Sequence, residues 1–117
     1  MNYKLFLDDL RQVQSIYPHA AESDFVVVRS CADFIKTIQQ KGLPEFISFD
    51  NDLGCDENEV PLPEGYDAAK WLVYESGMDL SELKFSVHSS NPVAKVNITS
   101  LLDNYIKFLR SSKGTNF

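Results

Sequence analysis

Short hydrophobic runs alternate with helical segments along this chain, and this alternation restricts the fold more than any other feature. The predicted strands are four apolar runs, at residues 3–8, 25–29, 45–50 and 83–88. The predicted helices lie between and after them, at residues 10–17, 31–41, 65–76 and 92–110. Such alternation predicts an α/β fold in which a parallel sheet carries helices on both faces.

The connections between the strands limit the order of the sheet. Crossovers between parallel strands are almost always right-handed, so few topologies remain. We expect a four-stranded parallel sheet in the order 2-1-3-4, with the first and third strands adjacent. Ligands of such sheets bind at the carboxyl ends of the strands, where the direction of winding reverses.

Residues that are typical of helix starts support the predicted helix boundaries. Ser30 is a predicted N-cap, and Asn91 precedes a proline at the start of the last helix, which is a favoured arrangement. The acidic loop at residues 51–64 is long for a compact domain, and long loops are often functional. We expect one domain at residues 1–110 and a polar C-terminal tail at residues 111–117.

Composition narrows the classes of function. The formal net charge of −6 disfavours broad binding to a nucleic-acid backbone, which needs a basic face. Two cysteines are too few for a disulfide framework or a zinc site. No stretch approaches the roughly 20 apolar residues that cross a membrane, and the first residues have no secretory pattern. We therefore expect a cytoplasmic protein without membrane partners.

Four acidic residues follow two of the predicted strands. Asp8 and Asp9 end the first run, and Asp50 and Asp52 end the third. If those strands pair in parallel, the carboxylates converge at one edge of the sheet. Two carboxylates about 4 Å apart repel by about 4 kcal/mol at an effective dielectric near 20. Such a cluster needs a cation, or a proton on one acid.

A metal site is the interpretation that we favour for these acids. Hard divalent cations such as Mg²⁺ or Mn²⁺ take carboxylate oxygens and keep several waters. Asp8 and Asp50 are the first candidates as ligands, while Asp9 and Asp52 can act through water or support the ligands. The alternative is turn chemistry, because aspartate favours turns and helix starts.

His88 ends the fourth run and is followed by Ser89, Ser90 and Asn91. Histidine exchanges protons near neutral pH, so His88 is a candidate acid or base. The alternative is a strand-end histidine bonded to the backbone. Ser89, Ser90 and Asn91 lead into a helix whose first amides can bind an anionic ligand or cofactor. Capping alone is their simpler explanation.

Two arginines are predicted at the same edge as the acids. Arg11 lies two residues beyond Asp9, and Arg29 ends the second strand. The forked guanidinium matches the oxygens of a phosphate, so both are candidates to stabilise a phosphoryl group. A salt bridge to a nearby aspartate is the alternative for each.

The paired acids after the first strand and the acid after the third resemble the receiver domains of two-component signalling. That resemblance implies a three-layer, flavodoxin-like fold in which Asp8, Asp9 and Asp50 bind magnesium. It also implies that Asp50 accepts a phosphoryl group. Receivers have a fifth strand bearing a lysine, and we expect this chain to lack that strand.

Five motifs along the chain occur together in one family. They are Leu5-Phe6-Leu7-Asp8-Asp9-Leu10-Arg11, Arg29, Ser48-Phe49-Asp50-Asn51-Asp52-Leu53-Gly54, Gly65-Tyr66-Asp67 and Val87-His88-Ser89-Ser90-Asn91-Pro92. With them the chain resembles, from end to end, a truncated relative of the receivers, the cyclic-phosphate-processing receiver domains. The family usually carries a histidine where this chain has Asn51.

This resemblance implies a metal-dependent phosphoesterase that processes cyclic phosphates on nucleotides or RNA ends. The metal would be Mg²⁺ or Mn²⁺. The side chains expected to take part in catalysis are His88, Asp52, Arg11 and Arg29. Two alternatives stay open: a degenerate receiver that accepts a phosphoryl group, and a non-catalytic module that binds a nucleotide or a protein.

Overall fold

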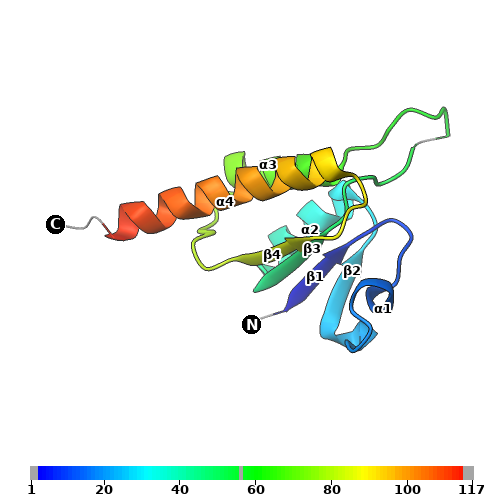
Figure 1. Ribbon diagram of the computed structural model, residues 1–117, viewed down its shortest axis with the longest axis horizontal. Helices are drawn as coiled ribbons and strands as arrows, with labels where there is room; N and C mark the ends of the chain where they lie inside the picture. Colours follow the sequence, from blue (N-terminus) through cyan, green and yellow to red (C-terminus); the bar gives the residue numbers. More distant parts are fainter. Residues whose placement is uncertain (1–2, 56, 115–117) are drawn as a thin grey trace.

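The computed structural model describes residues 3–55 and 57–114, and in them the strands form one parallel sheet (Figure 1). The order is β2-β1-β3-β4, as the sequence predicts. Leu7 pairs with Val28 on one side and with Phe49 on the other, so three strands end at the same level. The four strands in the described residues are β1 (Lys4–Leu7), β2 (Phe25–Val28), β3 (Phe46–Phe49) and β4 (Lys84–Val87).

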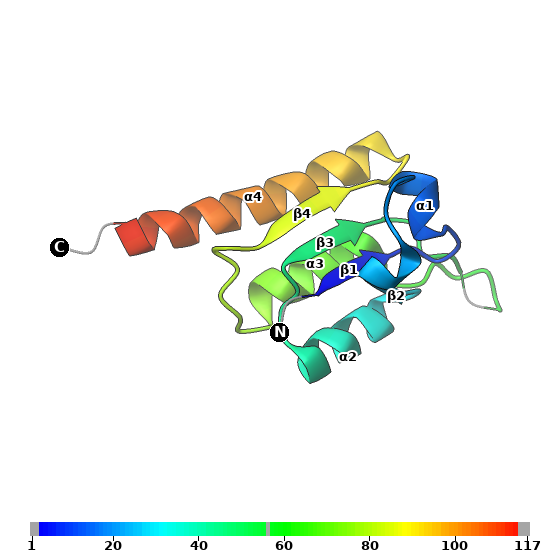
Figure 2. The same ribbon diagram turned by 90° about the horizontal axis from the view of Figure 1, so that it is seen from below.

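Helices cover the two faces of the sheet unequally. The three long helices α2, α3 and α4 lie on one face, whereas the single turn of α1 lies on the other (Figures 1 and 2). Right-handed crossovers require this placement of α1, α2 and α3 for the order 2-1-3-4, whereas α4, which no described strand follows, packs beside α3. The helices are α1 (Val13–Ile16), α2 (Cys31–Lys41), α3 (Gly65–Tyr74) and α4 (Pro92–Gly114), with a short 3-10 helix at Glu22–Asp24.

The core lies between the sheet and the three long helices. Alternate strand residues point to opposite faces, so Leu5 and Leu7 of β1 enter this core and Phe6 faces α1. The largest buried side chains that meet there include Phe34, Ile38, Ile47, Phe49, Leu72, Ile98 and Leu102. On the α1 face, the ring of Phe6 instead meets aromatic rings and polar side chains.

Helix starts follow the predicted capping residues. The Ser30 hydroxyl accepts a hydrogen bond from the N–H of Asp33 at 3.1 Å. The Asn91 side-chain oxygen accepts from the N–H groups of Val93 and Ala94, both at 3.1 Å. Among the described residues, no helix is both long and apolar enough to cross a membrane.

Two predicted boundaries are wrong. The helix expected at residues 10–17 is reduced to one turn, because its polar side chains offer little apolar surface to the sheet. The last helix does not stop near Arg110 but continues to Gly114. Ser111 and Ser112 are exposed, and serine costs less than about 0.7 kcal/mol in a helix, which permits this extension. Residues 115–117 lie outside the described residues.

Candidate functional site

A cavity of about 310 Å³ lies at the carboxyl ends of β1 and β3. It is the place where the sequence predicts a ligand site. The residues that line it are Asp8, Asp9, Leu10, Arg11, Asp50, Asp52, Gly54 and Ser90. The structure thus brings together the four aspartates, one of the two arginines and one serine of the predicted site.

Asp8 lies at the base of this cavity with only 1% of its surface exposed. One carboxylate oxygen, Oδ1, accepts hydrogen bonds from the N–H groups of Leu10 at 2.9 Å and Arg11 at 2.8 Å. The other, Oδ2, is 3.0 Å from Nε2 of His88. Burial opposes ionisation of Asp8, but these donors outweigh burial and lower its pKa below the ordinary value. Asp8 is therefore a buried carboxylate.

Asp50 is the second carboxylate at the base of the cavity, directly after β3. Among the described residues its side chain accepts one hydrogen bond, from the N–H of Asn51 at 2.8 Å. Burial first, and the negative charge of Asp8 second, raise the pKa of Asp50 to about 6, although the N–H of Asn51 and the charge of Arg11 act to lower it. The negative charge at this position is therefore only partly compensated by the protein.

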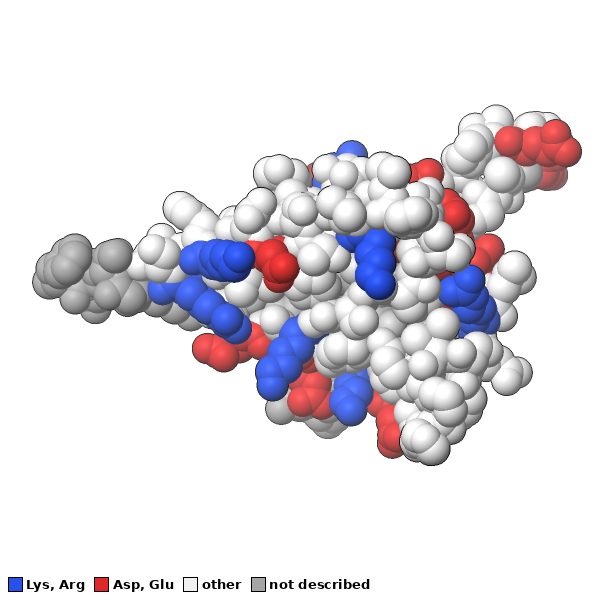
Figure 3. Space-filling model, viewed as in Figure 1, with Lys and Arg blue, Asp and Glu red and all other residues white. Residues whose placement is uncertain are grey.

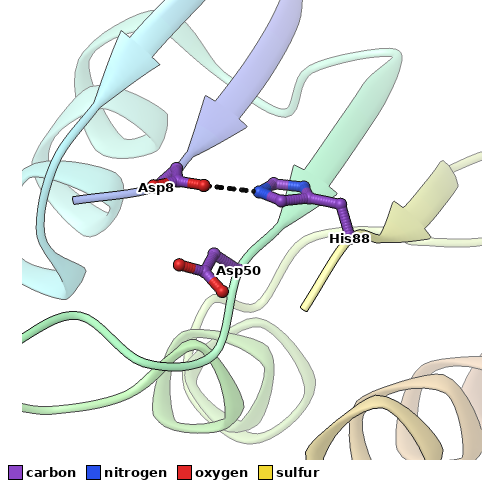
Figure 4. A group of neighbouring side chains, drawn as sticks. All are labelled: Asp8, Asp50 and His88. Atoms are coloured by element: carbon purple, nitrogen blue, oxygen red, sulfur yellow. Dashed lines mark hydrogen bonds and ion pairs between the residues drawn. The ribbon is translucent and has the colours of Figure 1, made fainter. Parts of the chain in front are cut away.

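His88 lies beneath the cavity and is not one of its lining residues. Figure 4 shows its ring directed at Asp8, with the Asp50 carboxylate beside them. Its Nδ1 is 2.7 Å from the hydroxyl of Ser48, so both ring nitrogens have protein partners. The side chain is 4% exposed and the ring stacks on Phe6 at 4.8 Å. In this structure His88 is bonded to Ser48 and Asp8, and its role as an acid or base stays a prediction.

The two predicted arginines have different positions. Arg11 lines the cavity, and its Nη1 donates to the carbonyl of His88 at 3.2 Å. Arg29 does not line the cavity. Its Nη1 donates to the carbonyls of Asp8 at 3.1 Å and Arg11 at 2.6 Å, so it braces the loop after β1.

Asp9 and Asp52 line the cavity from the loops after β1 and β3. Asp52 is exposed and accepts from the side-chain amide of Asn51 at 3.3 Å. Gly54 faces Asp9: a Cβ at Gly54 would lie 3.3 Å from Oδ2 of Asp9. Gly54 also has φ +87°, a conformation that favours glycine.

The three residues after His88 have unequal access to the cavity. Ser90 is exposed and lines it. The Ser89 hydroxyl is buried and accepts the N–H of Asn91 at 3.1 Å. Asn91 caps α4, which confirms the simpler explanation for that residue. Ser89 and Asn91 thus shape the turn, and only Ser90 is open to a ligand.

Asn51 is a residue whose place in the site was not predicted. It is 3% exposed, and its side chain accepts the N–H of Tyr66 at 3.1 Å and donates to Glu64 at 3.3 Å. These bonds join the end of β3 to the start of α3 across the long acidic loop. In the sequence, the indication of this role was the position of Asn51 directly after Asp50. The partners of its side chain, Glu64 and the N–H of Tyr66, are distant in sequence and could not be foreseen.

Ser48 and Tyr17 are two further residues that sequence reasoning missed. Ser48 is fully buried within an apolar strand and bonds to His88. The hydroxyls of Tyr17 and Ser48 are 2.8 Å apart. Ser48 could have been noticed as the hydroxyl residue in the apolar run Phe46-Ile47-Ser48-Phe49. No sequence pattern indicated a role for Tyr17.

The donor set fits a hard divalent cation. Ligand atoms of Asp8, Asp50 and His88 all lie within 4.8 Å of one another. A carboxylate oxygen keeps lone pairs for a cation after it has accepted a hydrogen bond, whereas Nε2 of His88 has none while it donates to Asp8, so Asp8 and Asp50 supply the donors. The partly uncompensated charge of Asp50 is the observation that favours a cation, since oxygen ligands of this kind suit Mg²⁺ and Mn²⁺.

Comparison with known proteins places this site in a family. No curated protein and no solved structure matches the chain. The family model described as "Cyclic-phosphate processing Receiver domain" matches residues 3–104, which include every predicted site residue. The chain belongs to this family of receiver domains.

Proposed function

We propose that this domain is a divalent-cation-dependent phosphoesterase that processes cyclic phosphates on nucleotides or RNA ends. The observation that carries the proposal is the Asp50 carboxylate, which is buried beside Asp8 at the base of an open cavity. A negative charge held there without full compensation is costly in the free protein, and a cation removes that cost.

Asp8, Asp9 and Asp50 are the residues that would hold Mg²⁺ or Mn²⁺. When bound, such a cation polarises a phosphoryl oxygen and helps to orient water. Asp8 is kept ionised by its backbone donors, so it is ready to bind without losing a proton. Asp50 loses its proton as pH rises through about 6, and it is therefore largely ionised at neutral pH.

Residues at the rim of the cavity would act on the substrate itself. Asp52 is exposed and would accept a proton from the attacking water, then give it to the ring oxygen that leaves phosphorus as the P–O bond breaks. Arg11 would stabilise negative charge that develops on the phosphoryl oxygens, and the Ser90 hydroxyl would donate to one of them. His88 would act on the substrate only through Asp8, whose carboxylate it orients.

The size and charge of the molecule favour a small ligand. A cavity of about 310 Å³ accepts a terminal nucleotide but not an extended strand. On the face drawn in Figure 3, basic side chains are scattered among acidic and uncharged ones. The projecting loop between β3 and α3 has an acidic tip, which repels a phosphate backbone.

The direct test is a hydrolysis screen with 2′,3′-cyclic nucleotides, 3′,5′-cyclic nucleotides and RNA with a cyclic-phosphate end. Each is assayed with Mg²⁺, with Mn²⁺ and with a chelator. We expect cation-dependent ring opening that Asp50→Asn abolishes and that the remote, exposed substitution Asp103→Asn leaves unchanged. Turnover by Asp50→Asn equal to the wild type would refute the assignment.

A receiver that accepts a phosphoryl group is the second candidate function. It is favoured by the position of Asp50, which faces the cavity directly after β3. Within residues 3–55 and 57–114, however, no strand follows β4 to supply the receiver lysine. Incubation with acetyl phosphate and intact-mass measurement separates the two functions, because a receiver gains one labile phosphoryl group.

The third candidate function is a module that binds a ligand without catalysis. A nucleotide or protein partner would then raise the melting temperature without turnover or phosphorylation.

A further inference from the structure

A chain of three polar contacts runs beneath the cavity, on the face of the sheet that carries α1. The hydroxyls of Tyr17 and Ser48 are 2.8 Å apart, and the Ser48 hydroxyl is 2.7 Å from Nδ1 of His88. The opposite nitrogen, Nε2, is 3.0 Å from Oδ2 of Asp8. The chain thus connects the residue that caps the end of α1 to a carboxylate of the site.

Only one arrangement of protons satisfies the chain when the imidazole is neutral. A carboxylate can only accept, so Nε2 of His88 must carry the proton that faces Asp8. Nδ1 is then an acceptor, and the Ser48 hydroxyl must donate to it. The Ser48 oxygen can in turn accept from the Tyr17 hydroxyl. The opposite tautomer would set a lone pair of Nε2 against the Asp8 oxygen.

Ser48 is an unexpected residue at its position, which suggests a specific role. It lies in the middle of β3, is fully buried, and pairs with Phe6 on β1. A hydroxyl in such a place needs partners, whereas an apolar side chain would need none. Its bonds to Tyr17 and His88 supply those partners, and the hydroxyl in turn supplies the donor that Nδ1 of His88 needs.

The ring of His88 is held firmly enough to transmit this effect. It stacks on Phe6 with centroids 4.8 Å apart and planes inclined by 4°. Tyr17 is held by a second stack, on Phe25, with centroids 5.6 Å apart. Neither the imidazole nor the Ser48 hydroxyl lines the cavity, and Asp8 is the residue that joins this chain of contacts to it.

We propose that Ser48 and Tyr17 are positioning residues, which hold the His88 ring with its Nε2–H directed at Asp8 and thereby keep the Asp8 carboxylate in place for its cation. This inference rests on the cation site of the proposed function. Carboxylates that bind metals are commonly hydrogen-bonded by outer partners, and removing such a partner weakens metal affinity or activity. Here the outer partners are a serine from β3 and a tyrosine from the end of α1.

The test combines the tautomer of His88 with cation affinity in the full chain. Long-range ¹H–¹⁵N NMR of protein labelled in histidine reports which nitrogen carries the proton, and His19 is an exposed internal reference. We expect Nε2–H at His88 in the wild type. Ser48→Ala should shift the Nδ1 resonance, because that nitrogen loses its hydrogen-bond donor, and it should weaken Mn²⁺ binding by about tenfold, the lower end of the effect of losing an outer partner.

Tyr17→Phe is the milder variant, and it allows the positioning role to be tested even if Ser48→Ala fails to fold. It removes one hydroxyl but leaves the ring to stack on Phe25, so a smaller weakening, of about twofold, is expected. Tyr3→Phe is the matched control, because it deletes a hydroxyl bonded to the carbonyl of Gly42, away from the site. Ser86→Ala is the control for Ser48→Ala, since the exposed Ser86 pairs with Ser48 across the sheet.

The outcomes separate this inference from the proposed function. An Nδ1–H tautomer in the wild type, or no change of the Nδ1 resonance and of Mn²⁺ affinity in Ser48→Ala, overturns the positioning role. A shifted Nδ1 resonance with unchanged affinity also overturns it, because Asp8 would then not depend on the chain of contacts. A wild type that takes up no Mn²⁺ refutes the cation site and the positioning role with it, even if the tautomer is as expected.

Discussion

The first residue of α3, Gly65, packs directly against the backbone that carries Asp50. A Cβ at Gly65 would lie 1.9 Å from the carbonyl oxygen of Asp50 and 3.0 Å from Cα of Asn51. The N–H of Gly65 also donates to the carbonyl of Asn51 at 2.9 Å. The lack of a side chain at Gly65 therefore lets α3 approach the end of β3, where the acidic site begins.

Gly65→Ala should therefore damage the site as well as the fold. A contact of 1.9 Å with backbone cannot be relieved by a side-chain rotation, so β3 and α3 must separate. We expect the free energy of unfolding to fall by about 1–3 kcal/mol, as in overpacked cores, and Mn²⁺ affinity to fall with it. Urea unfolding and calorimetric titration measure the two effects.

Gly77→Ala is the control that separates these two effects. No atom lies within 4 Å of a Cβ at Gly77, but its φ of +68° makes alanine unfavourable there. This variant should lose about 1–2 kcal/mol of stability while binding Mn²⁺ as the wild type does. Equal losses of affinity in both variants would mean that binding follows global stability and not the spacing of β3 and α3.

Asp50→Asn should make the metal-free protein more stable and remove its response to cations. The substitution keeps the shape of the side chain but removes a buried charge that lies beside Asp8. At pH 7 the free energy of unfolding should rise by about 1–2 kcal/mol, after allowance for solvent screening. Magnesium should stabilise the wild type, by about 2.7 kcal/mol at 100 times its dissociation constant, and leave the variant unchanged.

Asp103→Asn provides the comparison for this prediction, because Asp103 is an exposed acid of α4. It should respond to magnesium as the wild type does. Equal stabilisation of Asp50→Asn by magnesium would show that the cation binds elsewhere.

The stability difference between the wild type and Asp50→Asn should depend on pH in a defined direction. The pKa of Asp50 is raised from 3.8 to about 6 by burial first and by the charge of Asp8 second. A raised folded-state pKa contributes stability below the unfolded pKa, and this contribution is lost as pH rises through the folded pKa. The two proteins should therefore be similarly stable near pH 4, and the wild type should become the less stable one by pH 7.

Urea unfolding between pH 4 and pH 8 without cations measures this difference. Comparing the two proteins largely cancels the contributions of Asp8 and His88, whose pKa values are both lowered and which favour stability at higher pH. A difference that is constant over this range would contradict a raised pKa at Asp50.

The fold and the main acids of the site could be predicted because they depend on local sequence patterns. Apolar runs and helix caps define the elements, and handedness then defines the order of the sheet. Asp8 and Asp50 directly follow strands that are neighbours in that order, so their proximity is a consequence of topology. The length of α4 was missed because its last turn depends on weak propensities and not on a pattern.

The enclosure of His88 could not be predicted from the sequence. It depends on Phe6, Ser48 and Asp8, which belong to other strands or their ends and come together only in the folded sheet. A histidine at the end of a strand has the same local pattern whether it is open or buried. The hydrogen bonds from Arg29 to the loop after β1 could not be predicted for the same reason, since their acceptors are backbone carbonyls.

Arg11→Gln should change cation binding and turnover in opposite directions. The guanidinium of Arg11 lines the cavity and lowers the pKa of Asp50, so it competes with a cation for the same negative charges. Without it, Mn²⁺ affinity should rise by about two- to fivefold, a fraction of 1 kcal/mol for partly screened charges. Hydrolysis of a cyclic phosphate should fall by about 10²- to 10³-fold, as when a transition-state donor is removed.

Arg110→Gln is the matched control for Arg11→Gln. Arg110 also donates to a backbone carbonyl, that of Ser81 at 2.8 Å, but it lies on α4 away from the site. Its substitution should leave Mn²⁺ affinity and turnover unchanged. If affinity and turnover fall together in Arg11→Gln, then Arg11 supports the site through its bond to the carbonyl of His88 and not by stabilising the substrate.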